Sequence, residues 1–155
     1  MTASTTMTEA ELAELFAKAR AADDPNLLAE AVPYARTLGI TVERDGDSVV
    51  GRMRFDPMLI GDSSIPALHG GTTCALLEST ALFAVLWTVP SPQMPKTITM
   101  TVDYLRSGRP ADTVCRASFV RKGRRVLVVA VRAHQEREDE PIATAVVHVL
   151  VPGEP

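Results

Sequence analysis

Apolar and polar positions near the N-terminus repeat with the period of a helix. The apolar positions, spaced three or four residues apart, are Leu12, Leu15, Phe16 and Ala19. This spacing predicts an amphipathic helix over residues 9–22. Thr8 followed by Glu11 forms a capping-box pattern at the start of that helix. Asp24 followed by Pro25 predicts that a second, short helix begins there.

From residue 39 onward, strand patterns flank one long apolar run. Residues 39–45 and 48–55 predict two strands, and the Asp45-Gly46-Asp47 turn between them predicts a hairpin. Residues 72–88 predict a single long helix. The remaining predicted strands span residues 97–104, 112–121, 125–136 and 142–151. Because short turns separate the last strands, we expect these strands to pair antiparallel.

Strand 97–104 shows the clearest alternation. Its apolar side chains are Ile98, Met100, Val102 and Tyr104, and the positions between them are Thr97, Thr99, Thr101 and Asp103. This pattern predicts one face on the core and one face in water.

The long helix determines the expected architecture, an α+β fold. A helix that is apolar on nearly all sides must be covered on most of them, and a curved antiparallel sheet wrapped around it does so. Glu78 interrupts the apolar run from Thr72 to Val89, so we interpret the run as a core helix and not as a membrane span. A six-stranded sheet leaves edges, and pairing across a two-fold axis would protect them.

Composition and charge narrow the classes of protein to consider. The chain has 155 residues, of which 46% are hydrophobic and 23% charged, as in a globular domain. Residues 1–34 predict a helical extension and residues 35–155 the main domain. We expect no signal peptide, and the two cysteines, Cys74 and Cys115, suggest a reducing compartment; together these indicate a cytoplasmic protein. The net charge of −3 argues against binding to nucleic acid.

The charges are unevenly distributed along the chain. Residues 1–60 hold ten acidic and six basic side chains, whereas residues 103–137 hold nine basic and three acidic ones. The basic excess indicates either an anionic partner or a set of solvated strand edges and turns.

Glu78 is the one ionisable residue of the long helix, and its neighbours one turn away carry no charge. Either it lies on an exposed stripe, or it projects into a cleft and does acid–base or nucleophilic work. Gly70 and Gly71, where the helix begins, favour the second interpretation. Backbone N–H groups at a helix start lack an internal partner and can polarise a carbonyl oxygen.

The residues in this region carry a resemblance to a known family. Leu68-His69-Gly70-Gly71, then Leu77-Glu78-Ser79, then the threonine-rich run from Thr97 to Arg106 resemble the phenylacetate-pathway type of hotdog-fold acyl-CoA thioesterases. The resemblance covers roughly residues 35–151. It implies a curved antiparallel sheet around one central helix, and hydrolysis of an acyl-CoA thioester to a free acid and coenzyme A.

The resemblance also implies roles for particular residues. Glu78 would be the catalytic base or nucleophile, the N–H of Gly70 would polarise the thioester carbonyl, and Thr97 would position water. Members act as homodimers or homotetramers, with Glu78 of one subunit facing Gly70 of another, and use no cofactor or metal beyond the coenzyme A of the substrate. The further substrate-binding candidates are His69, Gly71, Asp62, Ser63, Leu82, Arg106, Arg121, Lys122 and Arg124.

One departure from the family pattern leaves alternatives open. Many members carry Asn or Gln in the loop before His-Gly-Gly, whereas this loop offers Asp62 or Ser63. A non-catalytic acyl-CoA sensor of the same fold is therefore an alternative. A hotdog dehydratase is a weaker one, because its His-Phe-Pro-Gly loop is absent. His69 can be catalytic or can anchor its loop, and Cys74 is better explained by packing than as a nucleophile.

Overall fold

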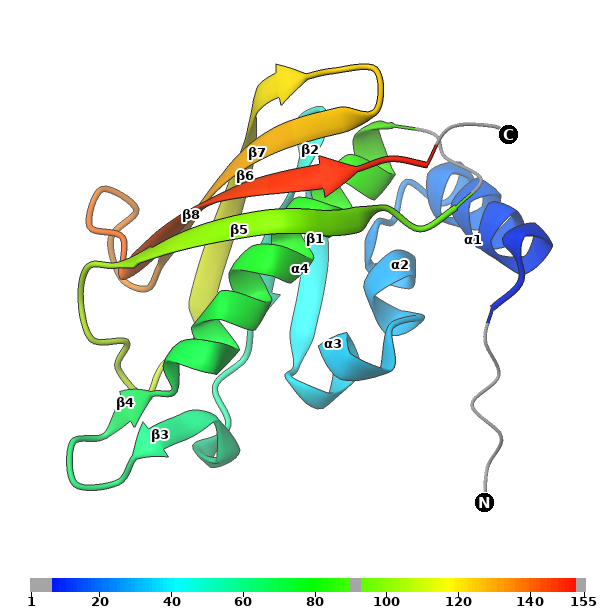
Figure 1. The fold of residues 1–155 in the computed structure, drawn as a ribbon. Coiled ribbons are helices and arrows are strands. Elements are labelled where there is room, and N and C mark those ends of the chain that lie inside the picture. Colours follow the sequence, from blue (N-terminus) through cyan, green and yellow to red (C-terminus); the bar gives the residue numbers. More distant parts are fainter. Residues whose placement is uncertain (1–6, 90–92, 153–155) are drawn as a thin grey trace.

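The computed structural model describes residues 7–89 and 93–152 and confirms an α+β architecture, with one antiparallel sheet curved around one long helix (Figure 1). The helical elements are α1 (Glu9–Ala21), α2 (Asn26–Glu30), α3 (Pro33–Thr37), the 3-10 turn η1 (Pro57–Leu59) and α4 (Gly70–Thr88). The strands are β1 (Ile40–Asp45), β2 (Ser48–Met53), β3 (Ile60–Asp62), β4 (Ala67–Leu68), β5 (Lys96–Tyr104), β6 (Thr113–Lys122), β7 (Val126–His134) and β8 (Ala143–Leu150).

The main sheet has six strands in the order β1-β2-β6-β7-β8-β5, and every neighbouring pair is antiparallel. The expected hairpin joins β1 to β2, and Gly46 in its turn has a φ of 60°, which favours glycine. Helix α4 packs against the sheet, with contacts to β2, β5, β6, β7 and β8. The strand order therefore places β1 and β5 at the two edges.

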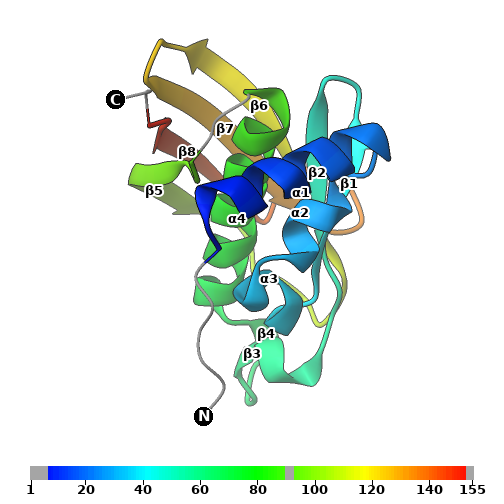
Figure 2. The same cartoon turned by 90° about the vertical axis from the view of Figure 1, so that its right-hand side faces the viewer.

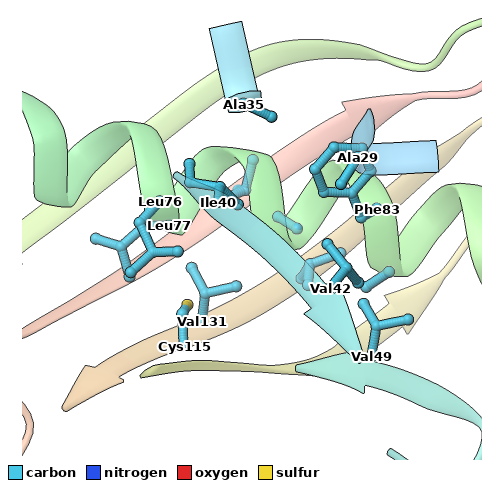
Figure 3. Packing of buried hydrophobic residues seen from close by; sticks show 14 of the residues in the cluster. Ala29, Ala35, Ile40, Val42, Val49, Leu76, Leu77, Phe83, Cys115 and Val131 are labelled. Carbon is cyan, nitrogen blue, oxygen red and sulfur yellow. The ribbon is translucent and has the colours of Figure 1, made fainter. Parts of the chain in front are cut away.

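The core lies between α4 and the sheet. Figure 3 shows Leu76, Leu77 and Phe83 of α4 beside side chains from the strands, and all of these are buried. By length and composition α4 could also cross a membrane, but ten of its nineteen residues are buried within the fold. The expectation of a core helix is therefore met, because the sheet covers the greater part of its apolar surface.

The close approach of α4 to β2 depends on a glycine. A Cβ atom on Gly51 of β2 would lie 2.2 Å from the hydroxyl oxygen of Thr80. Thr80 itself is fully buried and donates a hydrogen bond to the Leu76 carbonyl at 2.8 Å. The absence of a side chain at residue 51 therefore sets the distance between helix and sheet.

In Figure 2 the N-terminal helices α1, α2 and α3 lie nearest the viewer, with α4 and the main sheet behind them. The capping box at Thr8 and Glu11 is present as expected, since each residue's backbone N–H donates to the other's side chain. Ala19, Leu28 and Ala35 belong to the same buried cluster as α4 and the sheet. The division into residues 1–34 and 35–155 stays a prediction.

The two edges of the sheet differ. On β1, the backbone N–H of Val42 donates to the side-chain oxygen of Asn26 at 3.0 Å, and α2 and α3 pack beside this strand. Strand β5 has no second strand partner among the described residues. Ile98 and Tyr104 on β5 are 51% and 56% exposed. The β5 edge is thus the open one.

A bulge in β5 corrects the predicted alternation of that strand. The register with β8 shifts between Thr97 and Thr99, so Thr97 faces Val149 on the helix side, together with Met100 and Val102. Ile98, expected on the apolar face, is the extra residue of the bulge and is exposed. The sequence also gave no indication of α3 or of the small β3–β4 ribbon.

Candidate functional site

The first turn of α4 presents one free backbone donor. His69 is the N-cap, and its Nδ1 atom accepts from the Gly71 N–H at 2.9 Å. The N–H groups of Thr72 and Thr73 donate to the His69 carbonyl. In the part of the chain that the structure describes, the Gly70 N–H has no acceptor. The Gly70 N–H is therefore the backbone donor of the first turn that can bind an external group, and it lies at the positive end of the helix dipole.

His69 is positioned by two glycines. A Cβ atom on Gly71 would lie 2.9 Å from Nδ1 of His69, and one on Gly61 of β3 would lie 2.8 Å from its Cα. The His69 backbone N–H also donates to the Leu59 carbonyl at 2.8 Å. These contacts support the interpretation of His69 as the residue that anchors the loop.

Tyr104 covers the other side of Gly70. Its hydroxyl donates to the Gly70 carbonyl at 2.8 Å, and its ring carbons would lie 3.4 Å from a Cβ on Gly70. The hydroxyl also contacts the Cys74 side chain, and burial, followed by this thiol, raises the pKa of Tyr104. Cys74 is therefore a packing neighbour of the helix start, as the sequence suggested.

Asp62 is the last residue of β3 and Ser63 is the first residue of the turn that leads to β4, and both are exposed. The Asp62 carboxylate accepts from the Ser64 backbone N–H at 2.9 Å and from its hydroxyl at 2.6 Å. These bonds stabilise the ionised form and hold the pKa of Asp62 below its usual value. Asp62 therefore stabilises its own turn, and its role as a substrate-binding residue stays a prediction.

Glu78 lies on the stripe of α4 that the sheet does not cover. Ala75, Ser79 and Leu82, on the same side of the helix, are also only half-buried. Glu78 has no hydrogen-bond or ion-pair partner within residues 7–89 and 93–152. Glu78 thus fits both interpretations from the sequence, because it lies on an accessible stripe and its carboxylate has no partner among the described residues.

Gly70 and Glu78 of one chain are too far apart to act on one carbonyl group. They are eight residues apart on the same helix, which places them about 12 Å apart along its axis. A carboxylate and an oxyanion donor must each lie within about 3 Å of the reacting atoms. A site that uses both groups requires a second copy of the chain.

A depression of about 390 Å³ opens beside Gly70. Tyr104 and Arg106 contribute to its wall, together with Leu68, Gly108 and Ile142. The Arg106 guanidinium donates to the Pro141 carbonyl at 2.8 Å, which fixes it at this rim. Of the basic candidates, Arg106 is the one that the fold brings next to Gly70.

The other basic candidates lie elsewhere. Arg121, Lys122 and Arg124 surround the turn between β6 and β7, at the opposite end of the sheet from Gly70 (Figure 1). The Lys122 ammonium lies 4.4 Å from the centre of the Phe119 ring. Within the same basic segment, Arg109 is ion-paired with Glu136. Part of the local positive excess is thus neutralised within the chain.

Thr97 also lies far from Gly70. It lies seven residues before Tyr104 on β5, a span of about 20 Å in an extended strand. Its hydroxyl oxygen is buried and has no hydrogen-bond partner among the described residues. Leu82, by contrast, lies one turn from Glu78 on the same stripe.

Sequence reasoning did not identify Tyr104 as part of the site. The alternation of β5 marks Tyr104 only as an apolar position of a strand, and the family-like run that contains it continues to Arg106. The signal that could have identified it is a tyrosine at the end of a strand in a chain where Gly70 and Gly71 have no side chains to cover the start of the helix.

Comparisons with known proteins identify the family to which this fold and these motifs are similar. A family model described as the thioesterase superfamily matches residues 66–142, which include His69, Gly70 and Glu78. The medium/long-chain acyl-CoA thioesterase YigI of Escherichia coli strain K12 is 28% identical over 121 residues, covering 69% of this chain and 78% of that protein.

Solved structures extend the similarity to nearly the whole chain. A Shewanella oneidensis protein related to the thioesterase superfamily is 30% identical, with a TM-score of 0.73, covering 89% of this chain and 98% of that one. A Chromobacterium violaceum protein is 29% identical, also with a TM-score of 0.73, covering 92% of this chain and 99% of that one.

Proposed function

Because this chain belongs to the thioesterase superfamily, we propose that it hydrolyses the thioester of an acyl-CoA to the free acid and coenzyme A. The observation that carries the proposal is the pairing of two unengaged groups: the Gly70 N–H at the start of α4, and the Glu78 carboxylate on the accessible stripe of the same helix. The N–H stabilises negative charge on the carbonyl oxygen of the thioester, and the carboxylate either accepts a proton from water or attacks the carbonyl carbon.

The reaction uses these groups as follows. Glu78, as general base, takes a proton from water while the water oxygen attacks the thioester carbonyl carbon. The negative charge that develops on the carbonyl oxygen is stabilised by the Gly70 N–H. When the tetrahedral intermediate collapses, the carbon–sulfur bond breaks and the thiolate leaves. Because thiols have a pKa of about 8.5, the leaving group needs little protonation, and no cofactor is needed.

Glu78 can also act as the nucleophile. Its carboxylate then attacks the carbonyl carbon, the thiolate leaves, and water hydrolyses the resulting anhydride. Mass spectrometry of samples quenched during turnover distinguishes the routes, because only the nucleophilic route adds the mass of the acyl group to Glu78.

The two groups come from two copies of the chain. Within one helix, Gly70 and Glu78 are separated by the rise of eight residues, which is about 12 Å. In one copy they therefore cannot both act on the same carbonyl group. Two chains pairing along the open β5 edge would place their α4 helices side by side in opposite directions, with Glu78 of one copy facing Gly70 of the other. The exposed apolar side chains Ile98 and Tyr104 on β5 support this edge as the interface.

Arg106 is the candidate contact for the phosphates of coenzyme A. It lines the depression beside Gly70, so it is close to the group proposed to bind the thioester carbonyl. Its guanidinium is suited to phosphate oxygens. Arg121, Lys122 and Arg124 can reach a substrate only from a different copy or at a distant phosphate, and they stay secondary candidates.

The test is thiol release from short, medium, long and aryl acyl-CoAs, comparing wild type with Glu78→Gln. We expect turnover by wild type and a loss of about a hundredfold or more in the variant. Glu14→Gln, the same change on an exposed position of α1, is the matched control and should retain full activity. Saturable binding of acyl-CoA without turnover by wild type would contradict the proposal and favour the sensor.

A further inference from the structure

The side chain of Thr73, in the first turn of α4, is buried, yet its hydroxyl is not engaged. Thr73 is only 4% exposed. Within residues 7–89 and 93–152 the hydroxyl has no hydrogen-bond partner. A buried hydroxyl without a partner costs free energy relative to an apolar group of the same shape. The chain therefore keeps a polar atom here that its own folding does not require.

The usual acceptor for such a hydroxyl is already occupied. Threonines inside helices often donate to the carbonyl four residues earlier, as Thr80 does to Leu76 at 2.8 Å. For Thr73 this carbonyl is that of His69. It accepts from the N–H groups of Thr72 and Thr73, at 2.9 and 3.3 Å, and from the Thr72 hydroxyl at 2.7 Å. Because a carbonyl oxygen has two lone pairs, His69 leaves no acceptor for the Thr73 hydroxyl.

Thr73 and Gly70 border the same open space. Both residues line the depression of about 390 Å³. Residues three positions apart are neighbours on one face of a helix, and a helical side chain points back toward the N-terminal end. The Thr73 side chain therefore leans toward the turn in which Gly70 presents its free N–H. The first turn of α4 thus offers two unengaged donors on one side.

We propose that the Thr73 hydroxyl donates a hydrogen bond to the carbonyl oxygen of the thioester, beside the bond from the Gly70 N–H. This rests on the proposed function and adds a catalytic residue to it. When water or a carboxylate adds to the carbonyl carbon, the oxygen becomes negatively charged and binds more than one donor. The hydroxyl keeps its proton throughout, so the step needs no further acid or base.

The surroundings of the two donors suit negative charge on the bound oxygen. The N–H of Gly70 lies at the positive end of the helix dipole. Arg106 adds a positive charge at the rim of the depression. Among the described residues, none that lines the depression is acidic. An oxyanion bound here therefore meets attraction from the helix start and no like charge from the wall.

The test removes the hydroxyl and the methyl group of Thr73 separately. Thr73→Val keeps the shape and removes the donor, and its kcat for thiol release should fall about tenfold or more. Thr73→Ser keeps the donor and removes a buried methyl group, and its kcat should stay within about threefold of wild type. Stability should follow the opposite order. The midpoint of urea denaturation should not fall for Thr73→Val and should fall for Thr73→Ser.

Thr88→Val is the matched control for loss of a hydroxyl from this helix. Thr88 is the last residue of α4, and its hydroxyl donates to the Asp47 carbonyl at 3.3 Å, far from Gly70. Its kcat should stay within about twofold of wild type. Full activity of Thr73→Val would overturn the proposal. Activity that follows stability across the two Thr73 variants would also overturn it, because the hydroxyl would then have only a structural role.

A binding measurement separates this result from the fate of the proposed function. Two analogues of hexanoyl-CoA resist hydrolysis: a ketone with CH₂ in place of sulfur, and a thioether with CH₂ in place of the carbonyl. In calorimetric titrations wild type should bind the ketone more tightly than the thioether. Thr73→Val should weaken binding of the ketone alone, by about fivefold.

This pattern does not depend on turnover. Should wild type hydrolyse no acyl-CoA yet show it, the proposed function fails and the pair of donors stands. Should wild type hydrolyse acyl-CoA while Thr73→Val binds and reacts as wild type does, the function stands and the role of Thr73 fails. Equal affinities of wild type for the two analogues, or no binding of the ketone, would refute the pair of donors.

Discussion

The hydroxyl of Tyr104 donates a hydrogen bond to the carbonyl oxygen of Gly70 at 2.8 Å, and the phenol ring lies against the glycine. The two residues are 34 positions apart in the chain. Strand β5 thereby fixes the first turn of α4, and with it the direction of the peptide groups on either side of Gly70. The free N–H of Gly70 is held in place by a residue that does not itself touch it.

The role of that N–H can be tested without changing the helix. Gly70→Pro removes the donor at the first helical position, where proline is well tolerated, and the preceding His69 already has the extended backbone that proline requires. We expect kcat to fall about a hundredfold or more, as when an oxyanion donor is lost. The measurement is steady-state thiol release, with circular dichroism to check the fold.

Gly70→Ala is the matched control for this change. It keeps the N–H and adds a methyl group that would lie 3.4 Å from the Tyr104 ring, an ordinary contact distance. Its kcat should stay within about tenfold of wild type. Equal losses in the alanine and proline variants would show that space at residue 70, and not the donor, matters.

A site shared between two copies predicts complementation. Gly70→Pro and Glu78→Gln should each be inactive alone, but a mixed dimer carries one site in which both groups are native. Random mixing of two inactive variants should then restore about a quarter of the wild-type activity. The measurement is thiol release after the two variants are refolded together, with each refolded alone as the control. If no activity returns although mixed dimers form, the two groups do not act across an interface.

The contact between Gly51 and Thr80 predicts a large effect on stability. Gly51→Ala places a Cβ atom 2.2 Å from the Thr80 hydroxyl oxygen, in a part of the core with no free space. We expect the free energy of unfolding to fall by about 3 kcal/mol, at the upper end for overpacking. Urea denaturation measures it. In the background of Thr80→Ala the same change should cost less, because the clashing oxygen is gone. Additive costs would contradict this account.

The two cysteines should differ in reactivity. Burial raises the pKa of the Cys115 thiol to about 12, so almost no thiolate is present at pH 8, whereas Cys74 is half-buried at the helix start. Because the thiolate is the reactive form, iodoacetamide should alkylate Cys74 first and Cys115 only after unfolding. Peptide mapping by mass spectrometry identifies the labelled residue. Rapid labelling of Cys115 in the folded protein would show that the region around Thr80 opens.

The parts of the fold that the sequence predicts are those with local causes. The capping box of α1 and the Gly46 turn of the first hairpin are set by residues a few positions apart. The apolar length of α4 likewise required a sheet around it. The enzyme class, thioester hydrolase, is confirmed by the comparisons, since the resemblance rests on motifs that lie in order along the chain.

The features that the sequence did not predict depend on distant contacts. The bulge at Thr97 cannot be seen in a pattern that alternates without interruption, because it arises from the register with β8. Helix α3 begins at Pro33, which by itself is equally compatible with a turn. The cover that Tyr104 places over Gly70 is likewise visible only once β5 and α4 lie side by side.

The hydrogen bond from the Val42 N–H to Asn26 has a consequence for how many chains can join one sheet. A sheet with two bare edges can add neighbours without end, as a fibre does. Here α2 occupies one edge, so strands of another molecule can be added only along β5. When two such molecules join through β5, each has used its single open side, and growth stops. In the part of the chain that the structure describes, a short helix beside β1 thus leaves β5 as the edge at which the sheet can be extended.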